Sequence, residues 1–422
     1  MKKVLVVGFV FPFHATGSGR IPGLVKYLPE FGWQPVVLTA PLPAKDALGW
    51  EVIETPYDRP LDFWKRLFRL NPDESVRAQV NHRLGITSQN AFTRFVFTRL
   101  HEIVAYPDME RGWKSSALKA VSGLVQKGDI DAVISTSPPV TSNLIARELK
   151  ARYQIPWLAD FPHLWSQNNG YPYSFLRRMI DRRLEVRTLS AADALTTTSE
   201  PLAAKLRVLH KERPIYAITH GFDPEIVNVP PDKLTDKFTI TYTGSFAPVF
   251  REPSWLLEAL RNLIDKDVIE RSRVEVRFFG NKEPWIEGEI EKYGLSGMVI
   301  QYGRIPVEDA QAKQRESQLL FNPKWNDPKE PGIHSIKILE YLAARRPILA
   351  TGKYKDVVDE LLEETGAGIC AKSKEEMELA LIKIYKEYVK KGEVAFHGDT
   401  SEMDRYSHRE MARRFTQILN PL

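Results

Sequence analysis

The side chains best placed to do chemistry lie in the stretch Glu330–Leu342, where a Pro-Gly turn precedes apolar residues at helical spacing. The start of such a helix presents unpaired N–H groups and about half a positive charge, so a phosphate can bind there. Lys337, in the first turn or just after it, would add a full charge. The same pattern fits an ordinary capped amphipathic helix, so these residues alone leave both interpretations open.

A glycine-containing loop, Phe11–Arg20, follows the apolar run Val4–Val7. Gly17 and Gly19 would let the backbone approach a ligand closely, and the helix expected after them favours an anion. They do not complete the dinucleotide-binding fingerprint, because it needs a third glycine and an acidic residue at the end of the second strand. The sequence therefore argues against a nicotinamide-dependent enzyme.

A third loop, Phe161–Tyr171, combines aromatic, amide and histidine side chains directly after the short strand Trp157–Asp160. Open α/β sheets bind ligands at the carboxyl ends of their strands. This mixture of side chains suits a sugar or another polyol. For His163 two roles stay open, one in function and one as a satisfied structural histidine.

The composition sets limits on the function. The 422 residues include 59 basic and 54 acidic side chains, a net charge of +5 that is too weak to indicate a nucleic-acid-binding protein. The single cysteine, Cys370, excludes an intramolecular disulfide and fits a reducing compartment such as the cytoplasm. No stretch approaches about 20 unbroken apolar residues, so the sequence predicts no membrane-spanning helix.

These loops require two sheets to position them. In each half of the chain, strand-like runs alternate with helical patterns, which predicts two doubly wound, Rossmann-like α/β domains whose loops face a shared cleft. We expect an N-terminal domain over residues 1–226, a linker over 227–237 and a C-terminal domain over 238–402. A terminal helix, Met403–Leu419, has no strand partner. The expected strands are Val4–Val7, Val36–Thr39, Ala132–Ser135, Trp157–Asp160, Ala194–Thr198, Phe238–Thr243, Val274–Phe279, Met298–Tyr302, Gln318–Phe321 and Ile348–Thr351.

Residues 61–105 interrupt the alternation with aromatic and aliphatic side chains interleaved with Lys and Arg. Basic amphipathic helices of this kind can lie in a membrane interface, attracted to anionic lipid. They can equally be ordinary helices packed on a sheet, with their basic side chains outside. Peripheral contact of residues 61–105 with a membrane is therefore one of two interpretations.

Several motifs occur in the order seen in family 4 glycosyltransferases, and the chain resembles that family over nearly its whole length. They are Ile134–Pro139, Trp157–Trp165, His220–Pro224, Tyr242–Ser245, Gly303–Pro306 and Lys337–Leu349, of which Glu340–Leu349 is the most specific. The resemblance implies the GT-B fold and a retaining, hexosyltransferase-like enzyme. It implies a nucleotide-diphosphate sugar as donor and neither a metal ion nor another cofactor. In this fold the terminal helix 403–419 crosses back to the first domain.

The resemblance also assigns donor contacts. Glu340 matches the glutamate that holds the donor ribose, which suits a carboxylate that accepts two hydroxyl hydrogen bonds. His334 and Ser335 match the backbone amides that meet the diphosphate, with Lys337 close behind. The other matching positions are Arg304 and Ile305 beside the base, Gly17 and Ser18 at the phosphates, and the loop Gly244, Ser245 and Phe246.

Four of the positions at the expected site depart from the family pattern. Gly332 stands where a second glutamate is expected, and Glu330 could substitute if the loop has a different shape. Ser245 occupies the usual place of an arginine, which leaves Arg251 as the main cation. The candidate acceptor-binding residues are Asp160, His163 and Trp165, although Pro162 and His163 replace the usual arginine and aspartate.

The expected activity is transfer of a sugar to a glycan or lipid-linked acceptor in surface polysaccharide or glycolipid synthesis, at the inner face of a membrane. Lys337, Arg251 and Glu330 are the candidate catalytic residues, because fixed positive groups stabilise a leaving diphosphate. Two alternatives stay open: an epimerase-like GT-B enzyme that acts on a nucleotide sugar, and a non-catalytic sugar-binding scaffold.

Overall fold

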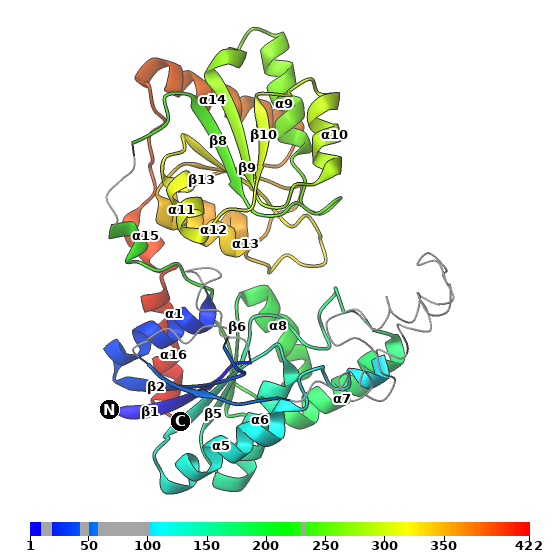
Figure 1. Ribbon diagram of the computed structural model, residues 1–422, viewed down its shortest axis with the longest axis vertical. Coiled ribbons are helices and arrows are strands. Elements are labelled where there is room, and N and C mark those ends of the chain that lie inside the picture. Colours follow the sequence, from blue (N-terminus) through cyan, green and yellow to red (C-terminus); the bar gives the residue numbers. More distant parts are fainter. Residues whose placement is uncertain (10–18, 43–49, 58–98, 100–101, 172, 229–232) are drawn as a thin grey trace. The chain divides into compact units, whose positions relative to one another are not determined.

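The computed structural model describes residues 1–9, 19–42, 50–57, 99, 102–171, 173–228 and 233–422 (Figure 1). The chain divides into two compact units. Unit 1 comprises the described residues within Met1–Phe11, Val25–Ile218 and Arg413–Leu422, and unit 2 those within Pro12–Leu24 and Thr219–Ala412. The main division after Ile218 thus lies earlier than the expected residue 226.

Unit 1 contains, in its described part, a seven-stranded sheet in which all paired neighbours are parallel. The apolar runs of the sequence form its central strands, which are buried because helices cover both faces of a doubly wound sheet. The strand order is β3-β2-β1-β4-β5-β6-β7. The strands are β1 (Lys2–Val7), β2 (Trp33–Thr39), β3 (Glu51–Glu54), β4 (Ala132–Thr136), β5 (Trp157–Phe161), β6 (Ala194–Thr197) and β7 (Ile215–Ala217).

Helices lie on both faces of this sheet (Figure 1). Those wholly within unit 1 are α5 (Trp113–Lys127), α6 (Val140–Tyr153), α7 (Phe175–Leu189) and α8 (Glu200–Leu209), with the short 3-10 helix η1 (Leu28–Phe31). Two further helices, α1 (Arg20–Tyr27) and α16 (His408–Leu419), begin in unit 2 and end in unit 1. No described helix is long and apolar enough to cross a membrane.

Unit 2 is built in the same way, with a six-stranded parallel sheet of order β10-β9-β8-β11-β12-β13 among its described residues. The strands are β8 (Phe238–Thr243), β9 (Val274–Phe279), β10 (Val299–Gly303), β11 (Leu319–Pro323), β12 (Ile348–Thr351) and β13 (Gly368–Ala371). The helices are α9 (Ser254–Asp265), α10 (Pro284–Lys292), α11 (Val307–Arg315), α12 (Ile336–Ala344), α13 (Val357–Thr365), α14 (Lys374–Lys391) and α15 (Thr400–Asp404), with η2 (Ile226–Asn228) and η3 (Arg271–Arg273).

Each sheet has one place where the strand order reverses. In unit 1 the reversal lies between β1 and β4, and in unit 2 it lies between β8 and β11. Open α/β sheets bind ligands outside the carboxyl ends of the strands at such a point. The fold therefore marks one candidate ligand site in each unit.

The expected strands and the α/β fold class are confirmed, but the terminal helix is not continuous. Residues 405–407 separate α15 from α16 because this stretch pairs with Phe222. The Phe222 amide donates to the carbonyl of Tyr406 at 3.0 Å, and the His408 amide donates to the carbonyl of Phe222 at 2.8 Å. The close approach needs Gly221, since a Cβ there would lie 2.4 Å from the His408 nitrogen.

Candidate functional site

Helix α12 lies at the reversal point of the unit 2 sheet. The expected helix is confirmed, and Ser335 is its N-cap, with the extended φ of −72° and ψ of 138°. The buried Tyr341 hydroxyl accepts a hydrogen bond of 3.0 Å from the amide of Thr243, the last residue of β8. The Ser335 hydroxyl lies 3.5 Å from Asn322 Oδ1 in β11. These contacts tie α12 to the two strands that flank the reversal point.

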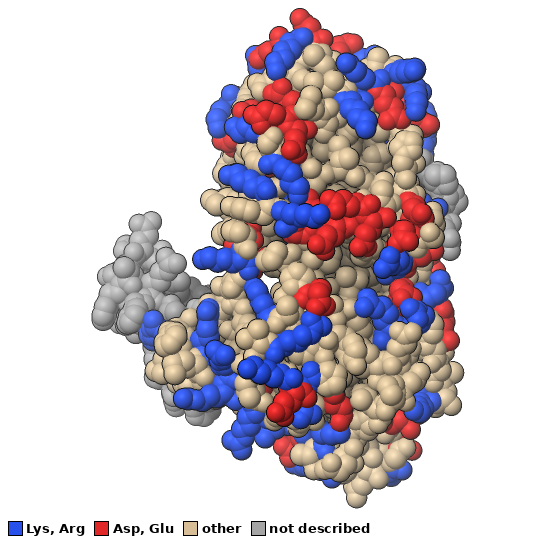
Figure 2. Space-filling model, turned by 180° about the vertical axis from the view of Figure 1, so that it is seen from behind, with Lys and Arg blue, Asp and Glu red and all other residues tan. Residues whose placement is uncertain are grey.

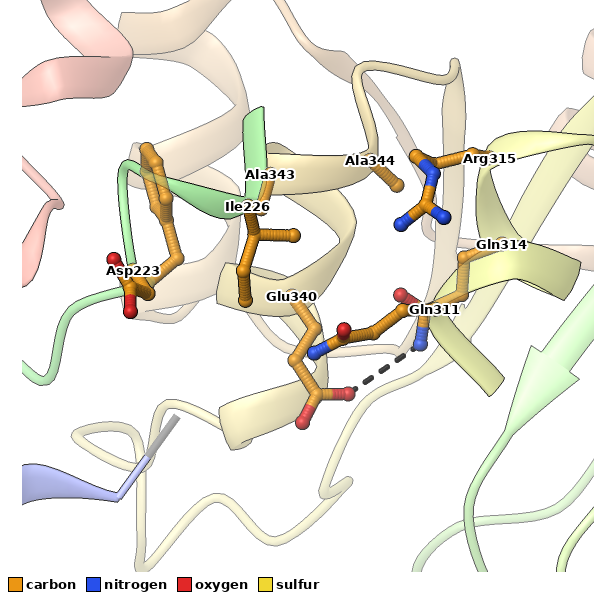
Figure 3. A pocket seen from close by; sticks show the side chains of 9 residues that line it. Asp223, Ile226, Gln311, Gln314, Arg315, Glu340, Ala343 and Ala344 are labelled. Atoms are coloured by element: carbon orange, nitrogen blue, oxygen red, sulfur yellow. Dashed lines mark hydrogen bonds between the residues drawn. The ribbon is translucent and has the colours of Figure 1, made fainter. Parts of the chain in front are cut away.

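The carboxylate of Glu340 is held by two partners of different kinds. Its Oε2 lies 3.1 Å from Lys337 Nζ and 3.4 Å from Gln314 Nε2, and the residue is only 7% exposed. Gln314 also donates to Thr243 Oγ1 at 2.8 Å, which links α11 to β8. Figure 3 shows the Glu340 and Gln314 side chains pointing toward one another. The sequence pattern of α12 predicted Lys337 and Glu340, but it gave no reason to single out Gln314.

The hollow beside these side chains has a volume of only about 10 Å³. That is room for about one water molecule, whereas ligand pockets usually measure roughly 300–1,000 Å³. Its walls come from α11, α12 and the segment before η2, as Figure 3 shows. The hollow does not itself form a nucleotide pocket, so a nucleotide at Glu340 would lie outside it.

His334 lies just before the N-terminus of α12 and is uncharged at neutral pH. Burial lowers the pKa of its imidazole to about 4, and a hydrogen bond with the backbone of Val357 only partly opposes the shift. Its Nδ1 is buried and has no hydrogen-bond partner among the described residues. At neutral pH the positive groups here are therefore the helix end and Lys337, not His334.

Arg251 reaches the same reversal point from the loop after β8. Its backbone pairs with Ala247 through hydrogen bonds of 2.8 and 2.7 Å, which fold this loop back on itself. The guanidinium lies 5.7 Å from the ring centroid of Trp325, just after β11, and Phe250 stacks on the same ring at 4.8 Å. Its Nε is buried and has no hydrogen-bond partner among the described atoms. The structure thus brings Arg251 to the strand ends that carry α12.

Two other residues of this loop play different structural parts. Gly244 is required by packing, because a Cβ there would lie 2.7 Å from the Tyr242 hydroxyl, which itself donates to the Ser245 carbonyl at 3.0 Å. Phe246, expected to contact the donor, has its side chain in the core, 4.6 Å from the Tyr242 ring and 4.9 Å from that of Phe278. The assignment is corrected for its side chain, since core packing uses that group.

The remaining donor candidates divide into three groups. Arg304 and Ile305 follow β10, two strands away from the reversal point, and Arg304 Nε donates to Asn281 Oδ1 at 2.6 Å. Glu330 lies in the loop before α12, and its carboxylate makes no hydrogen bond or ion pair with the described residues. Gly17 and Ser18 lie outside the described residues. The structure leaves the roles of all five as predictions.

A buried ion cluster that the sequence did not point to supports the α12 loop. Lys324, directly after β11, is 3% exposed, and its Nζ contacts Asp359 Oδ2 at 2.5 Å, Asp356 Oδ1 at 3.1 Å and the Tyr354 carbonyl at 2.8 Å. Lys372, after β13, also pairs with Asp359. Because the Val357 amide donates to the Pro331 carbonyl at 3.2 Å, this cluster also fixes the start of the loop that leads to α12.

The reversal point of unit 1 opens into a cavity of about 400 Å³. Its walls include Phe9 after β1, Ser137 after β4, and His163 and Trp165 after β5. This is the size and position expected of a small-molecule site in an open α/β sheet. Of the expected acceptor residues, His163 and Trp165 line the cavity.

Asp160, the third expected acceptor residue, does not line this cavity. It is the fourth residue of β5 and is 1% exposed, and its Oδ1 accepts a hydrogen bond of 2.7 Å from Thr196 Oγ1 in the neighbouring strand. A carboxylate in this position joins two strands of the sheet. Its role in acceptor binding stays a prediction.

Three carboxyl groups that the sequence did not point to line the cavity: Asp108, Glu110 and Asp181, of which Asp181 pairs with Arg177. Asp108 accepts hydrogen bonds from the Thr141 amide at 2.7 Å and the Thr141 hydroxyl at 2.6 Å, and so caps α6. Burial raises the pKa of Asp108 despite these bonds. Burial and the neighbouring Asp108 charge both raise the pKa of Glu110. In the sequence Asp108 and Glu110 belong to a Pro-Asp-x-Glu stretch before a helix. The stretch itself has no helical or strand periodicity that would have singled them out.

No metal site is evident in the described part of the chain, where no group of three or more His, Cys, Asp and Glu side chains is arranged to hold an ion. The one cysteine is poorly suited to act as a nucleophile. Burial raises the pKa of the Cys370 thiol to about 12, so the thiol is protonated at neutral pH.

Two family models match the chain one after the other. Residues 18–215 match the glycosyl transferase 4-like domain, and residues 237–387 match the glycosyl transferases group 1 domain. No curated protein matches the chain in sequence.

Three solved structures have similar folds: a sucrose-phosphate synthase from Thermosynechococcus elongatus, HepE from Anabaena in complex with UDP and glucose, and a glycosyltransferase from Rickettsia africae. Each is 13% identical to this chain. In the same order, the TM-scores are 0.61, 0.60 and 0.57. The alignments cover 100%, 100% and 99% of this chain, and they cover 99%, 100% and 97% of the three solved chains. At this identity the likeness shows the fold alone. The two family matches and the two Rossmann-like units together show that the chain belongs to the group 1 glycosyltransferases and has the GT-B fold.

Proposed function

We propose that this glycosyltransferase takes a sugar from a nucleotide-diphosphate donor bound by unit 2 and transfers it, with retention of configuration, to a glycan or lipid-linked acceptor. The observation that carries the proposal is the arrangement at α12, where Glu340 is held by Lys337 and Gln314 beside a positive helix end. A carboxylate fixed in this way can accept hydrogen bonds from ribose hydroxyls, while Lys337 and the helix end attract the diphosphate.

The proposed chemistry breaks the bond between the anomeric carbon and the diphosphate oxygen and forms a bond from that carbon to an acceptor hydroxyl oxygen. The electron pair of the broken bond stays on the diphosphate. Lys337, Arg251 and the amides at the start of α12 stabilise the charge that develops there. The acceptor attacks from the face that the diphosphate leaves, and its proton passes to a diphosphate oxygen. Retention then requires no covalent enzyme intermediate.

The donor base is best sought first among uridine nucleotides. HepE, which shares the fold, has been solved in complex with UDP, with UDP and glucose, and with UDP-glucose. At 13% identity this is a starting point for screening only.

We further propose that the enzyme works at the cytoplasmic face of a membrane, in surface polysaccharide or glycolipid synthesis. Residues 61–105, the expected membrane contact, lie largely outside the described residues. Helix α7 supplies support from the described part, because Phe175 and Leu176 are 78% and 67% exposed on the same helix as the exposed arginines Arg182 and Arg183. Figure 2 shows Lys and Arg side chains gathered at the lower left of the view, at the end of unit 1 where α7 lies.

The test combines nucleotide binding with product analysis. We expect one of UDP, GDP, ADP or CDP, or its sugar, to raise the melting temperature, because a ligand of the folded state stabilises it by mass action. Lys337→Ala should lower kcat by roughly 100- to 1,000-fold, as the loss of one charge-stabilising group does. Lys266→Ala, which removes an exposed lysine of the same unit, is the control.

Four results would contradict the proposal. Full transfer activity of Lys337→Ala would show that Lys337 is not a catalytic residue. A product with inverted anomeric configuration would show that the enzyme is not a retaining transferase. Conversion of the donor sugar to its epimer without any acceptor would instead favour the epimerase-like alternative. If no nucleotide binds, the non-catalytic scaffold is favoured.

A further inference from the structure

We propose that the cavity of unit 1 admits an acceptor sugar that is uncharged or carries an amino group, and that Glu110 excludes sugars with a carboxylate or phosphate. The inference rests on the proposed function in one respect, since it takes this cavity as the acceptor site. It adds the chemical class of the acceptor and a residue that selects it.

The cavity carries negative charge that no lysine or arginine among the described lining residues compensates. Asp108 and Glu110 both line the cavity and lie close enough for the charge of Asp108 to act on Glu110. Neither carboxylate makes an ion pair with the described residues. The Asp108 carboxylate already accepts from the amide and the hydroxyl of Thr141, so its capacity is largely used. Glu110 has no such partner from another element in the described part of the chain, and it is the carboxylate left to meet a ligand.

No Lys or Arg that the structure describes lines the cavity. Two arginines pack against the tyrosines of its wall: Arg178 lies 5.2 Å from the ring centroid of Tyr171, and Arg177 lies 4.7 Å from that of Tyr173. Arg177 is buried, and each of its three guanidinium nitrogens is already hydrogen-bonded. Its Nε contacts Asp181 Oδ1 at 3.0 Å, and its terminal nitrogens donate to the carbonyls of Glu102, Ala105 and Pro107. Among the described residues, an anionic sugar in the cavity would therefore meet the carboxylates of Asp108 and Glu110 without a compensating lysine or arginine in the wall. Like charges brought together in this way strongly disfavour binding.

The walls of the cavity also have a shape that suits a sugar ring. Trp165, Tyr171 and Tyr173 present rings to the cavity, and the two tyrosine rings meet edge to face with centroids 5.3 Å apart. The Tyr171 hydroxyl donates to Asp181, which fixes the ring. Fixed aromatic surfaces with a few polar groups are typical of pockets that bind an amphipathic ring such as a pyranose. The Asn168 amide and Glu110 supply groups that can pair with its hydroxyls.

The test measures binding of three related monosaccharide probes: neutral methyl glucoside, methyl glucosaminide with an amino group at C2, and methyl glucuronide with a carboxylate at C6. Saturation-transfer NMR on the full chain gives their relative affinities without knowledge of the natural acceptor. For the wild type we expect the glucuronide to bind at least about tenfold more weakly than the glucoside. Glu110→Gln should narrow this gap, and Glu110→Lys should reverse the order of glucuronide and glucosaminide.

Asp129→Lys is the matched control, because it changes an exposed carboxylate of the same unit by the same charge. It should leave the order of the probes unchanged. Thermal unfolding of each variant shows whether it is folded. If Glu110→Lys does not fold, the effect of Glu110→Gln on the affinity for the glucuronide decides the test.

The outcomes separate this inference from the proposed function. If a nucleotide stabilises the protein but the wild type binds the glucuronide as well as the glucoside, the inference is overturned and the donor assignment stands. The same holds if Glu110→Lys keeps the wild-type order, or if none of the probes binds. If the probes follow the expected order but no nucleotide binds, the proposed function fails and the charge selection by Glu110 remains.

Discussion

Gln314 contributes to the donor site without carrying charge. Its side-chain amide bridges Thr243 at the end of β8 and Glu340 in α12, at 2.8 and 3.4 Å, and the residue is 1% exposed. A carboxylate that pairs with Lys337 alone could still rotate about that single contact. The second contact restricts it, and fixed groups of this kind are what a binding site requires.

We therefore expect Gln314→Leu to raise the KM for the donor several-fold and to change kcat much less. It should also lower the free energy of unfolding by about 1–3 kcal/mol, because Thr243 and Glu340 lose a partner in a buried setting. Steady-state kinetics and urea unfolding measure both effects.

Gln311→Leu is the matched control, since this side chain comes from the same helix and lines the same hollow, but has no hydrogen bond to the described residues. Equal effects of the two substitutions would show that the loss reflects helix α11 in general and not the bridge to Glu340.

At the scale of elements, the ion cluster around Lys324 joins the end of β11 to the start of α13. Burial by itself would raise the pKa of Asp359, but hydrogen bonds from Lys324 and Lys372 hold it well below its usual value. The stabilisation from this carboxylate is thus present above the ordinary aspartate pKa and is lost as the pH falls toward the lower folded value.

Lys324→Met should lower the free energy of unfolding at pH 7 by about 3–5 kcal/mol, because it leaves two carboxylates buried without their main partner. The loss should shrink in mild acid, where protonation removes the unpaired charge. Urea unfolding at pH 7 and pH 4 measures the change.

Lys372→Met provides the comparison, because that lysine pairs with the same Asp359 but is 32% exposed. We expect a clearly smaller effect. A similar loss from both variants would contradict the view that burial makes Lys324 the central partner.

Helix α7 leads to a prediction about membranes. Phe175 and Leu176 are adjacent at its start, and both expose most of their surface on a helix that also carries exposed arginines, a combination that favours anionic lipid interfaces. Phe175→Ser with Leu176→Ser should lower sedimentation with phosphatidylglycerol-containing vesicles at least about tenfold, since two apolar side chains are removed from the interface.

Val208→Ser serves as the control, because Val208 is 67% exposed on α8 of the same unit. Unchanged vesicle binding of the α7 variant would remove α7 as the membrane contact. Binding to phosphatidylcholine vesicles alone should be weak for every variant, because the arginines then have no anionic partner.

For the whole molecule, the sequence predicted the elements better than the side-chain positions. β-Branched runs such as Phe238–Thr243 and the helical spacing after Ser335 are local signals, and both elements were found as expected. The break in the terminal helix was missed because its cause, pairing with Phe222, lies far away in the sequence.

The candidate sites show the same limit at the level of residues. Motif position located Glu340 and Lys337, because their helix spacing fixes them relative to each other. It also selected Asp160 and Phe246, whose burial depends on neighbouring strands and rings that a local pattern does not reveal. Glu110 and Gln314 were missed for the opposite reason, since only the tertiary fold brings them to a cavity and to Glu340.

The return of the chain end to unit 1 limits how this enzyme can be recombined with its relatives. Trp33 Nε1 donates to Asn420 Oδ1 at 3.0 Å, and Arg414 donates to the Ala217 carbonyl at 2.7 Å, so the last residues complete the first unit. A chimaera made by one crossover after Ile218 would combine unit 1 of this enzyme with the C-terminal residues of a relative. Those residues would have to pack on a unit 1 other than their own. Grafting a new sugar-donor specificity therefore calls for an insertion with two junctions, near Ile218 and Arg413, that leaves the native tail in place.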